Sequence, residues 1–206
     1  MKTNIVLASA SPRRKELLEQ IGLSFNVYSA DIDETPLKSE QPFKYVSRIA
    51  RSKAHEVWKK MAASSAFLVE ERTLVLASDT SVVLDNEIFG KPQTKLEYFR
   101  MMACLSGRKH EVITSVHALE VVASDIKSEK AFSVCTKVSF KLLTPQEIEW
   151  YWHTGEPADK AGGYGIQGRG ALFVEGIEGS YSSVVGLPLK ETAELLAGYQ
   201  VDIWSY

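Results

Sequence analysis

The chain has 206 residues, of which 45% are hydrophobic and 24% are charged, and its net charge is −2 at pH 7. This length allows one sizeable domain or two small lobes that share a core. The composition is ordinary for a soluble globular protein. A slightly acidic balance argues against a protein that coats DNA or RNA, because such proteins are usually basic, but it leaves room for a local basic pocket.

The cysteine and histidine content gives expectations about location and metal binding. Cys104 and Cys135 are expected to be buried thiols, which suits a reducing compartment. The four histidines have no zinc-type spacing. No apolar run is long enough to span a membrane, and the N-terminus lacks the layout of a signal peptide. We therefore expect a cytoplasmic protein that binds neither membranes nor nucleic acid.

Strand and helix signals alternate along the chain, which predicts an α/β or α+β fold with a mixed sheet. A short strand at 5–7 leads into a helix with Ser11 as N-cap, Pro12 as first residue and Gly22 as stop. The other expected elements are, in order, a short strand and acidic loop over 25–36, a helix over 42–61, and two extended runs over 73–89 joined by a hairpin turn at Asp85–Asn86. Next comes a helix from a capping box at Thr94–Glu97 to about Gly107, followed by long strands over 110–122 and 130–143 with a turn near 124–128. A second capping box at Thr144–Glu147 opens a helix that ends near Gly155. A strand over 171–177 and a last helix from about Leu187 complete the expected elements. No composition shift marks a linker, so the prediction is one domain over residues 1–206.

The stretch LASASPRRKELL places three cations, Arg13, Arg14 and Lys15, in the first turn of a helix. A helix start carries partial positive charge, so cations there are disfavoured unless an anion is bound. Guanidinium groups bind phosphate oxygens through two hydrogen bonds, and Ser9 and Ser11 could add hydroxyl donors. This pattern predicts a phosphate site; the alternative is a solvated basic turn in which each arginine pairs with a carboxylate.

Carboxylates form a second candidate group. Asp79 lies within the apolar run LVLASDTSVV, where a carboxylate is costly unless it is paired or binds a metal; the alternative is a strand-end residue that caps a turn. Asp31, Asp33 and Glu34 follow one another in SADIDETP, which is usually a solvated loop. Together with Asp79, some of these side chains could hold a hard divalent cation such as Mg²⁺ or Mn²⁺.

Two lysines and a glycine-rich segment complete the candidates. Lys53 falls on the apolar stripe of its helix, where it either extends its ammonium to solvent or directs it into a cleft. Lys91 stands between Gly90 and Pro92 in a predicted turn. Gln167 is surrounded by glycines that would let the backbone approach a ligand, although a tight structural loop would look the same. The combination suits phosphoryl chemistry on a nucleotide.

Three stretches together resemble the Maf family of nucleoside triphosphate pyrophosphatases: LASASPRRKELL, SDTSVVLDNEIFGKP and EPADKAGGYGIQGRGALFVEGIEGSYSSVVGLPL. They occur in the family's order and span essentially the whole chain. The resemblance implies an α/β fold related to the inosine triphosphate pyrophosphatases, with an elongated mixed sheet, flanking helices and two lobes around a central cleft. It also implies a house-cleaning hydrolase of nucleotide metabolism that cleaves a nucleoside triphosphate to the monophosphate and pyrophosphate.

The resemblance also assigns roles to residues. Asp79 matches the catalytic proton acceptor, and Glu34, Lys53 and Lys91 match polar residues of the cleft. Our own hypothesis is that Glu34 and Asp79 hold Mg²⁺ or Mn²⁺, with Asp79 acting as base, metal ligand or both. Ser9 and Arg14 match the phosphate-side turn. The substrate-selecting positions are Arg13, Thr80 and Gln167.

Those three residues are typical of the branch of the family that prefers dTTP and UTP. The alternatives are the same chemistry on 7-methyl-GTP and a non-enzymatic nucleotide-binding regulator of cell division. The resemblance further implies a homodimer. Without nucleotide, the arginine side chains of the first turn are expected to be poorly ordered or to hold a stray anion.

Overall fold

The computed structural model describes residues 3–64 and 72–204. Its strands form a seven-stranded mixed sheet in the order β2-β1-β3-β5-β6-β7, with β4 paired to β3. β1 pairs in parallel with β2 and β3, whereas the β3–β4 and β6–β7 pairs are antiparallel. Helices flank this sheet, which confirms the predicted mixed α/β fold class.

The chain divides into two compact units, and each is described by itself. The first unit comprises the described residues of Met1–Asp79, Ser115–Ser133 and Gly186–Tyr206. The second comprises Thr80–Thr114 and Val134–Val185. Three strands contribute residues to both units, namely β3 (Arg72–Leu84), β5 (Lys109–Val122) and β6 (Asp125–Phe140).

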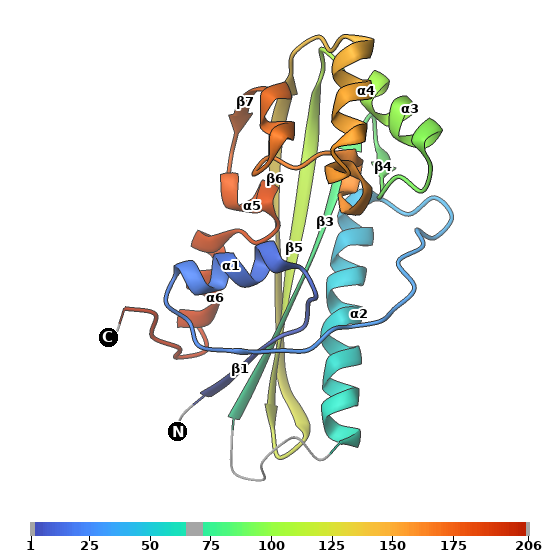
Figure 1. The fold of residues 1–206 in the computed structure, drawn as a ribbon. Coiled ribbons are helices and arrows are strands. Elements are labelled where there is room, and N and C mark those ends of the chain that lie inside the picture. Colours follow the sequence, from blue (N-terminus) through green and yellow to red (C-terminus); the bar gives the residue numbers. More distant parts are fainter. Residues whose placement is uncertain (1–2, 65–71, 205–206) are drawn as a thin grey trace. The chain divides into compact units, whose positions relative to one another are not determined.

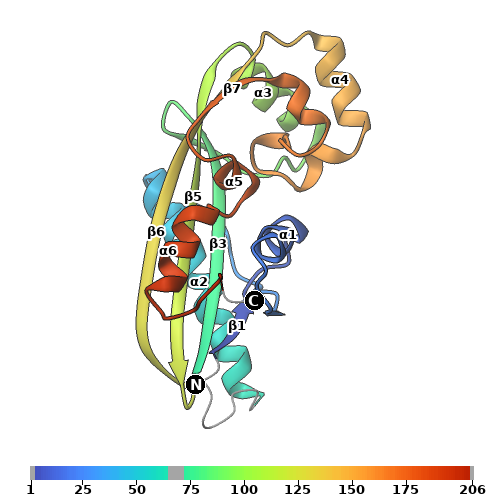
Figure 2. The same cartoon turned by 90° about the vertical axis from the view of Figure 1, so that its left-hand side faces the viewer.

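The first unit contains two helix layers, one on each face of its strands. Its own elements are β1 (Thr3–Leu7), α1 (Pro12–Gln20), β2 (Asn26–Val27), α2 (Pro42–Ala63) and α6 (Leu189–Ala197). On one face, α2 packs Ala54, Val57 and Met61 against alternate strand residues such as Val75. On the other, Leu196 of α6 packs against the intervening strand residues, and Figure 2 shows the two helices on opposite sides of the strands. The helix predicted over 42–61 is confirmed.

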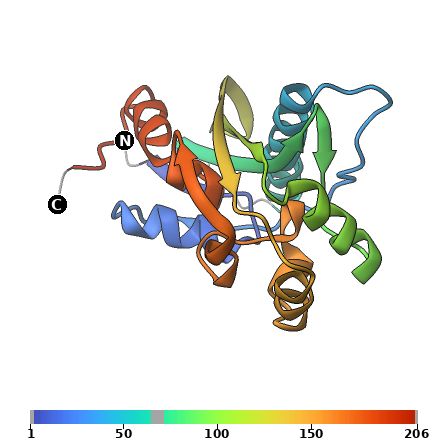
Figure 3. The ribbon, with the colours of Figure 1, turned by 90° about the horizontal axis from the view of Figure 1, so that it is seen from above.

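The second unit is built around an aromatic core. Its own elements are β4 (Glu87–Phe89), α3 (Lys95–Leu105), α4 (Pro145–His153), the 3-10 turns η1 (Glu156–Asp159), η2 (Ala161–Gly163) and η3 (Arg169–Phe173), β7 (Val174–Glu178) and α5 (Tyr181–Val185). Helices α3 and α4 lie side by side, as Figure 3 shows. Buried Tyr98, Tyr151 and Phe173 contribute to the core between these elements.

Helix starts and stops follow the sequence closely. Ser11 is the N-cap of α1 and Pro12 its first residue, but the Ser11 side chain makes no capping bond. Thr94 accepts a hydrogen bond from the Glu97 backbone N–H, and at Thr144 both bonds of a capping box are present. The three predicted helix starts and the capping box at Thr144 are confirmed. The box at Thr94 is only half formed, because the Glu97 carboxylate accepts from the Gln93 backbone N–H instead of that of Thr94.

Two local predictions about strands are wrong. The hairpin turn between β5 and β6 uses Ala123 and Ser124, both with positive φ, and Asp125 already begins β6. Residues 171–173 belong to η3, so β7 starts only at Val174. Helix α5 was not predicted, because its five residues are too few to show the helical periodicity of apolar side chains.

The burial predicted for the cysteine thiols is also wrong. Cys104 is exposed on α3, and Cys135 on β6 is only half-buried. Cys104 lies away from the helix face that carries the buried Tyr98, Met101, Met102 and Leu105. Its place within a helical pattern therefore did not mean that its thiol is buried. Within residues 3–64 and 72–204, no helix has the length and apolar character needed to cross a membrane.

Gly162 is expected to be indispensable for the second unit. Its φ is +66°, and a Cβ there would lie 2.8 Å from Cβ of Val82. Gly162→Ala should destabilise the protein by about 2–5 kcal/mol, since the left-handed backbone costs roughly 1–2 kcal/mol and the overpacking about 1–3 kcal/mol. Gly155→Ala is the matched control, because Gly155 has a φ of +74° but nothing within 4 Å. Urea unfolding should give the control a clearly higher free energy of unfolding than Gly162→Ala. Equal losses of stability in the two variants would show that the contact of the added Cβ with Val82 has no effect.

Candidate active site

Asp79 lies at the point where β3 faces helix α2. Along β3, alternate residues share a face, and Val75 and Ala77 pack into the core beneath α2. The same alternation directs Asp79 to that face, where Lys53 stands on the buried stripe of α2. The two side chains meet: Lys53 Nζ donates to Asp79 Oδ1 at 2.8 Å. Of the two readings of Lys53, the structure supports an inward ammonium.

Glu34 completes a triad of charges within the first unit. Its Oε1 lies 2.7 Å from the same Lys53 Nζ, so one ammonium joins two carboxylates. Burial is the main cause that raises the pKa of Asp79, and Glu34 adds to it, while Lys53 and Arg14 oppose it. Lys53 and Arg14 therefore favour the charged form of this carboxylate, against the effect of burial.

The loop that carries Glu34 is fixed by side chains of α2. Tyr45 donates its hydroxyl to the backbone oxygen of Glu34 at 2.8 Å. Arg48 donates to both carboxylate oxygens of Glu40 at 2.6 and 2.7 Å, which holds the end of the loop. Asp33 accepts from the Thr35 backbone N–H, and Asp31 is exposed. Among the three acidic residues of this loop, Glu34 is therefore the one whose carboxylate reaches Lys53.

The basic first turn of α1 is ordered by hydrogen bonds within the first unit. Arg14 donates from Nε to the backbone oxygen of Gly186 at 2.9 Å and from Nη1 to Ser9 Oγ at 3.4 Å. Ser9 is buried and also accepts from the Ser11 backbone N–H. Burial lowers the pKa of Arg14, and the nearby Asp79 raises it. These contacts hold the Arg14 side chain against the first unit; Arg13 beside it is half-buried. Whether the two side chains are poorly ordered or hold a stray anion without nucleotide stays a prediction.

The remaining candidates lie in the second unit. Thr114 donates to the Ser183 backbone oxygen at 2.8 Å, so the 2.9 Å contact between Thr80 and Thr114 hydroxyls has Thr80 as its donor. Lys91 is exposed in the loop after β4. The preceding Gly90 accepts from the Gly162 N–H at 2.9 Å, which ties this loop to the glycine-rich segment.

Gln167 is exposed in a tight turn that Glu156 supports. The turn is closed by the Gly168 N–H, which donates to the Gly165 backbone oxygen at 3.3 Å. Glu156 accepts from the Arg169 and Gly170 backbone N–H groups at 2.9 and 3.3 Å. Sequence reasoning missed Glu156; its place directly after Gly155, ahead of a run of glycines that need backbone partners, was the available signal.

Removing the Glu156 carboxylate should loosen this turn. Glu156→Ala leaves two backbone N–H groups and the Tyr151 hydroxyl, which donates to Glu156 at 2.6 Å, without their partner. The Tyr151 hydroxyl and the Gly170 N–H are part-buried, and each lost partner of such a group costs about 1–3 kcal/mol. We therefore expect faster amide exchange over 165–170 and a lower melting temperature. Glu175→Ala, at an exposed carboxylate of the same unit, should change neither. Unchanged exchange in Glu156→Ala would contradict a supporting role.

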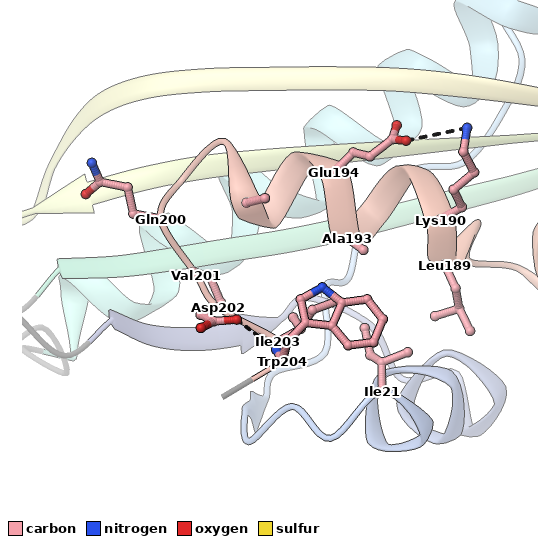
Figure 4. Close-up of a pocket in the computed structure, with 11 residues that line it drawn as sticks. Ile21, Leu189, Lys190, Ala193, Glu194, Gln200, Val201, Asp202, Ile203 and Trp204 are labelled. Carbon is pink, nitrogen blue, oxygen red and sulfur yellow. Dashed lines mark hydrogen bonds and ion pairs between the residues drawn. The ribbon is translucent and has the colours of Figure 1, made fainter. Parts of the chain in front are cut away.

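A separate apolar groove of about 710 Å³ lies elsewhere in the first unit, along the C-terminal segment (Figure 4). Ile21, Leu189 and Trp204 are among its lining side chains, and no candidate site residue lines it. It is therefore a different feature from the site of paired charges.

The fold and the site define a class of α/β proteins in which a carboxylate on a strand of a mixed sheet is buried against a lysine of the helix that covers that strand. The particular family follows from comparison of the sequence. The family model described as "Maf-like protein" matches residues 4–199, and the chain belongs to this family.

Curated relatives cover almost the whole chain. A dTTP/UTP pyrophosphatase of Colwellia psychrerythraea is 48% identical over 94% of this chain and 87% of its own. A protein with the same name from Aliivibrio fischeri is 46% identical over 95% of this chain and 98% of its own. Among solved structures, a HAM1 protein from Coxiella burnetii is similar with a TM-score of 0.49 at 14% identity, over 96% of this chain and all of its own.

Proposed function

We propose that this chain is an enzyme that hydrolyses dTTP and UTP to the nucleoside monophosphate and pyrophosphate. The observation that carries the proposal is the buried arrangement in which Lys53 joins Glu34 and Asp79. Relatives with 46–49% identity over most of the chain are named dTTP/UTP pyrophosphatases. A regulator that only bound nucleotide would not need a desolvated carboxylate whose pKa is raised.

Glu34 and Asp79 are the residues that would hold a divalent metal, Mg²⁺ or Mn²⁺. The donor set fits such an ion, since both carboxylates already converge on one positive centre, the Lys53 ammonium, and hard cations prefer oxygen ligands. When bound, the metal would neutralise phosphate charge and lower the pKa of a coordinated water.

The protein's own groups account for the rest of the reaction. Water attacks the α-phosphorus and a new P–O bond forms, while the bond from the α-phosphorus to the bridging oxygen breaks and pyrophosphate leaves. Asp79 accepts the proton of the attacking water. Lys53 holds Asp79 in its charged form, and Arg14 and Ser9 bind phosphate oxygens. Lys91 contributes a further cation to the phosphate chain.

Substrate choice is assigned to Arg13, Thr80 and Gln167. A pyrimidine presents carbonyl acceptors and a ring N–H, which a guanidinium and an amide can meet without accommodating a purine equally well. We further propose that the protein acts as a homodimer in the cytoplasm, where it removes noncanonical nucleotides.

The test is release of pyrophosphate from a panel of nucleoside triphosphates in the presence of Mg²⁺ or Mn²⁺. We expect dTTP and UTP to be cleaved with a higher kcat/KM than purine nucleotides and 7-methyl-GTP. A preference for 7-methyl-GTP would overturn the specificity assignment alone. Binding of dTTP without cleavage of any nucleotide would favour a regulator over an enzyme.

A further inference from the structure

The first unit contains a second group of metal-ligand side chains, away from Lys53's partners. His55 on α2, His117 on β5 and Glu129 on β6 each direct one ligand atom to a common point, and these atoms all lie within 4.8 Å of one another. His117 shares a strand face with Leu119 and Val121, which pack beneath α2. Because the three residues are far apart in sequence, the histidine spacing gave no indication of the cluster.

The separations within this cluster match those of a small coordination shell. His55 Nε2 lies 3.1 Å from Glu129 Oε1, and His117 Nε2 lies 3.2 Å from Glu129 Oε2. Ligands at 2.0–2.1 Å from a tetrahedral zinc ion are about 3.3 Å from one another. Each imidazole therefore already lies at nearly the required separation from one Glu129 oxygen, His55 from Oε1 and His117 from Oε2.

The orientation of His55 is poorly explained by hydrogen bonding. Its Nε2 is buried and lies 3.1 Å from Glu129 Oε1, but the direction of this contact is poor for a hydrogen bond. A buried ring nitrogen without a hydrogen bond is costly. An ion shared by both imidazoles and the carboxylate would satisfy this nitrogen without requiring an aligned N–H group.

The charges around the cluster allow a cation to bind. Burial is the main cause that lowers the pKa of His117, so its imidazole is neutral near pH 7 and has a lone pair to offer. Arg51 donates to both Glu129 oxygens, at 3.1 and 3.4 Å, so a metal ion would have to displace it. Its side chain is 58% exposed and can turn into solvent. The imidazole rings of His55 and His117 are neighbours, with ring centres 6.1 Å apart.

We propose that His55, His117 and Glu129 bind one divalent transition-metal ion, with Zn²⁺ as the best fit to two imidazoles and one carboxylate. Three protein ligands leave a fourth position for water. The ion would join α2 to strands β5 and β6, and it is separate from the metal assigned to Glu34 and Asp79.

The test is calorimetric titration of the full chain, first stripped with a chelator, with Zn²⁺ alone, together with the visible absorption of the Co²⁺ form. We expect one tight Zn²⁺ per chain and the intense bands of tetrahedral Co²⁺. His55→Gln and Glu129→Gln should each weaken Zn²⁺ binding by at least about a hundredfold, since loss of an outer-shell partner alone costs roughly 10- to 100-fold. Both residues are partly exposed, so these variants should fold.

Two controls identify the site. Asp79→Asn should keep tight binding, which separates this site from the proposed catalytic metal. His153→Gln removes an exposed histidine that contacts Glu149 on α4, and it should also keep tight binding. Equal Zn²⁺ affinity in His55→Gln and the parent, or no tight binding in the parent, would overturn the proposal. In the latter case the three side chains form an ion-pair network with Arg51.

Discussion

Asp79→Asn is expected to reduce kcat for pyrophosphate release from dTTP by roughly 10²–10⁴-fold, the usual contribution of a positioned general base. The amide keeps the shape of the carboxylate but cannot accept the proton of the attacking water. It also replaces one of the two carboxylates proposed to hold the metal with a neutral amide, which is a weaker ligand. Because burial raises the pKa of Asp79, a neutral side chain at this place should fold at least as well as the parent.

The matched control is Asp31→Asn, which removes an exposed carboxylate from the loop of the same unit. Its kcat should equal that of the parent, and steady-state measurement of pyrophosphate at saturating dTTP compares the two. If Asp79→Asn hydrolysed dTTP and UTP as fast as the parent, the assignment of Asp79 would be wrong.

Lys53→Met should lower the free energy of unfolding by about 3–5 kcal/mol at neutral pH, because it leaves a buried carboxylate without its principal cation. The pKa of Asp79 should then lie still further above that of the unfolded chain. A raised carboxyl pKa means that the folded state binds the proton more tightly, so the variant should regain stability as the pH falls toward that pKa. Urea unfolding at pH 5 and pH 8 measures this difference.

Two further variants test the cause of that loss. Lys59→Met removes an exposed lysine from the same helix and should change stability by less than about 0.5 kcal/mol. Lys53→Met combined with Asp79→Asn should be more stable than Lys53→Met alone, because the unpaired charge is gone. If the change in the free energy of unfolding of the double variant equalled the sum of the two single changes, the two side chains would not interact energetically.

Local signals in the sequence predicted much of this structure. The caps at Thr94 and Thr144 and the turn at Asp85–Asn86 were recognisable because each depends on residues only a few positions apart. The turn at Ala123–Ser124 was not, since neither residue is typical of a two-residue hairpin loop. Tertiary pairing of the strands overrode the local preference there.

The site residues were predicted unevenly for the same reason. Lys53 was recognisable as a cation on an apolar stripe, and Asp79 as a carboxylate in an apolar run. Which carboxylate of the acidic loop meets them was open, because that choice depends on how Tyr45 and Arg48 hold the loop. Glu156 and the cluster around Glu129 join residues from separate elements, so spacing along the chain contains little information about them.

The division into two units falls inside strands rather than in linkers, and the chain passes from one unit to the other four times, after Asp79, Thr114, Ser133 and Val185. No single truncation can therefore release either unit as an intact polypeptide. Asp79, the proposed proton acceptor, and Thr80, proposed to select the substrate, are joined by one peptide bond at such a passage. Exchange of specificity between relatives is consequently better attempted by point substitution than by recombining whole segments.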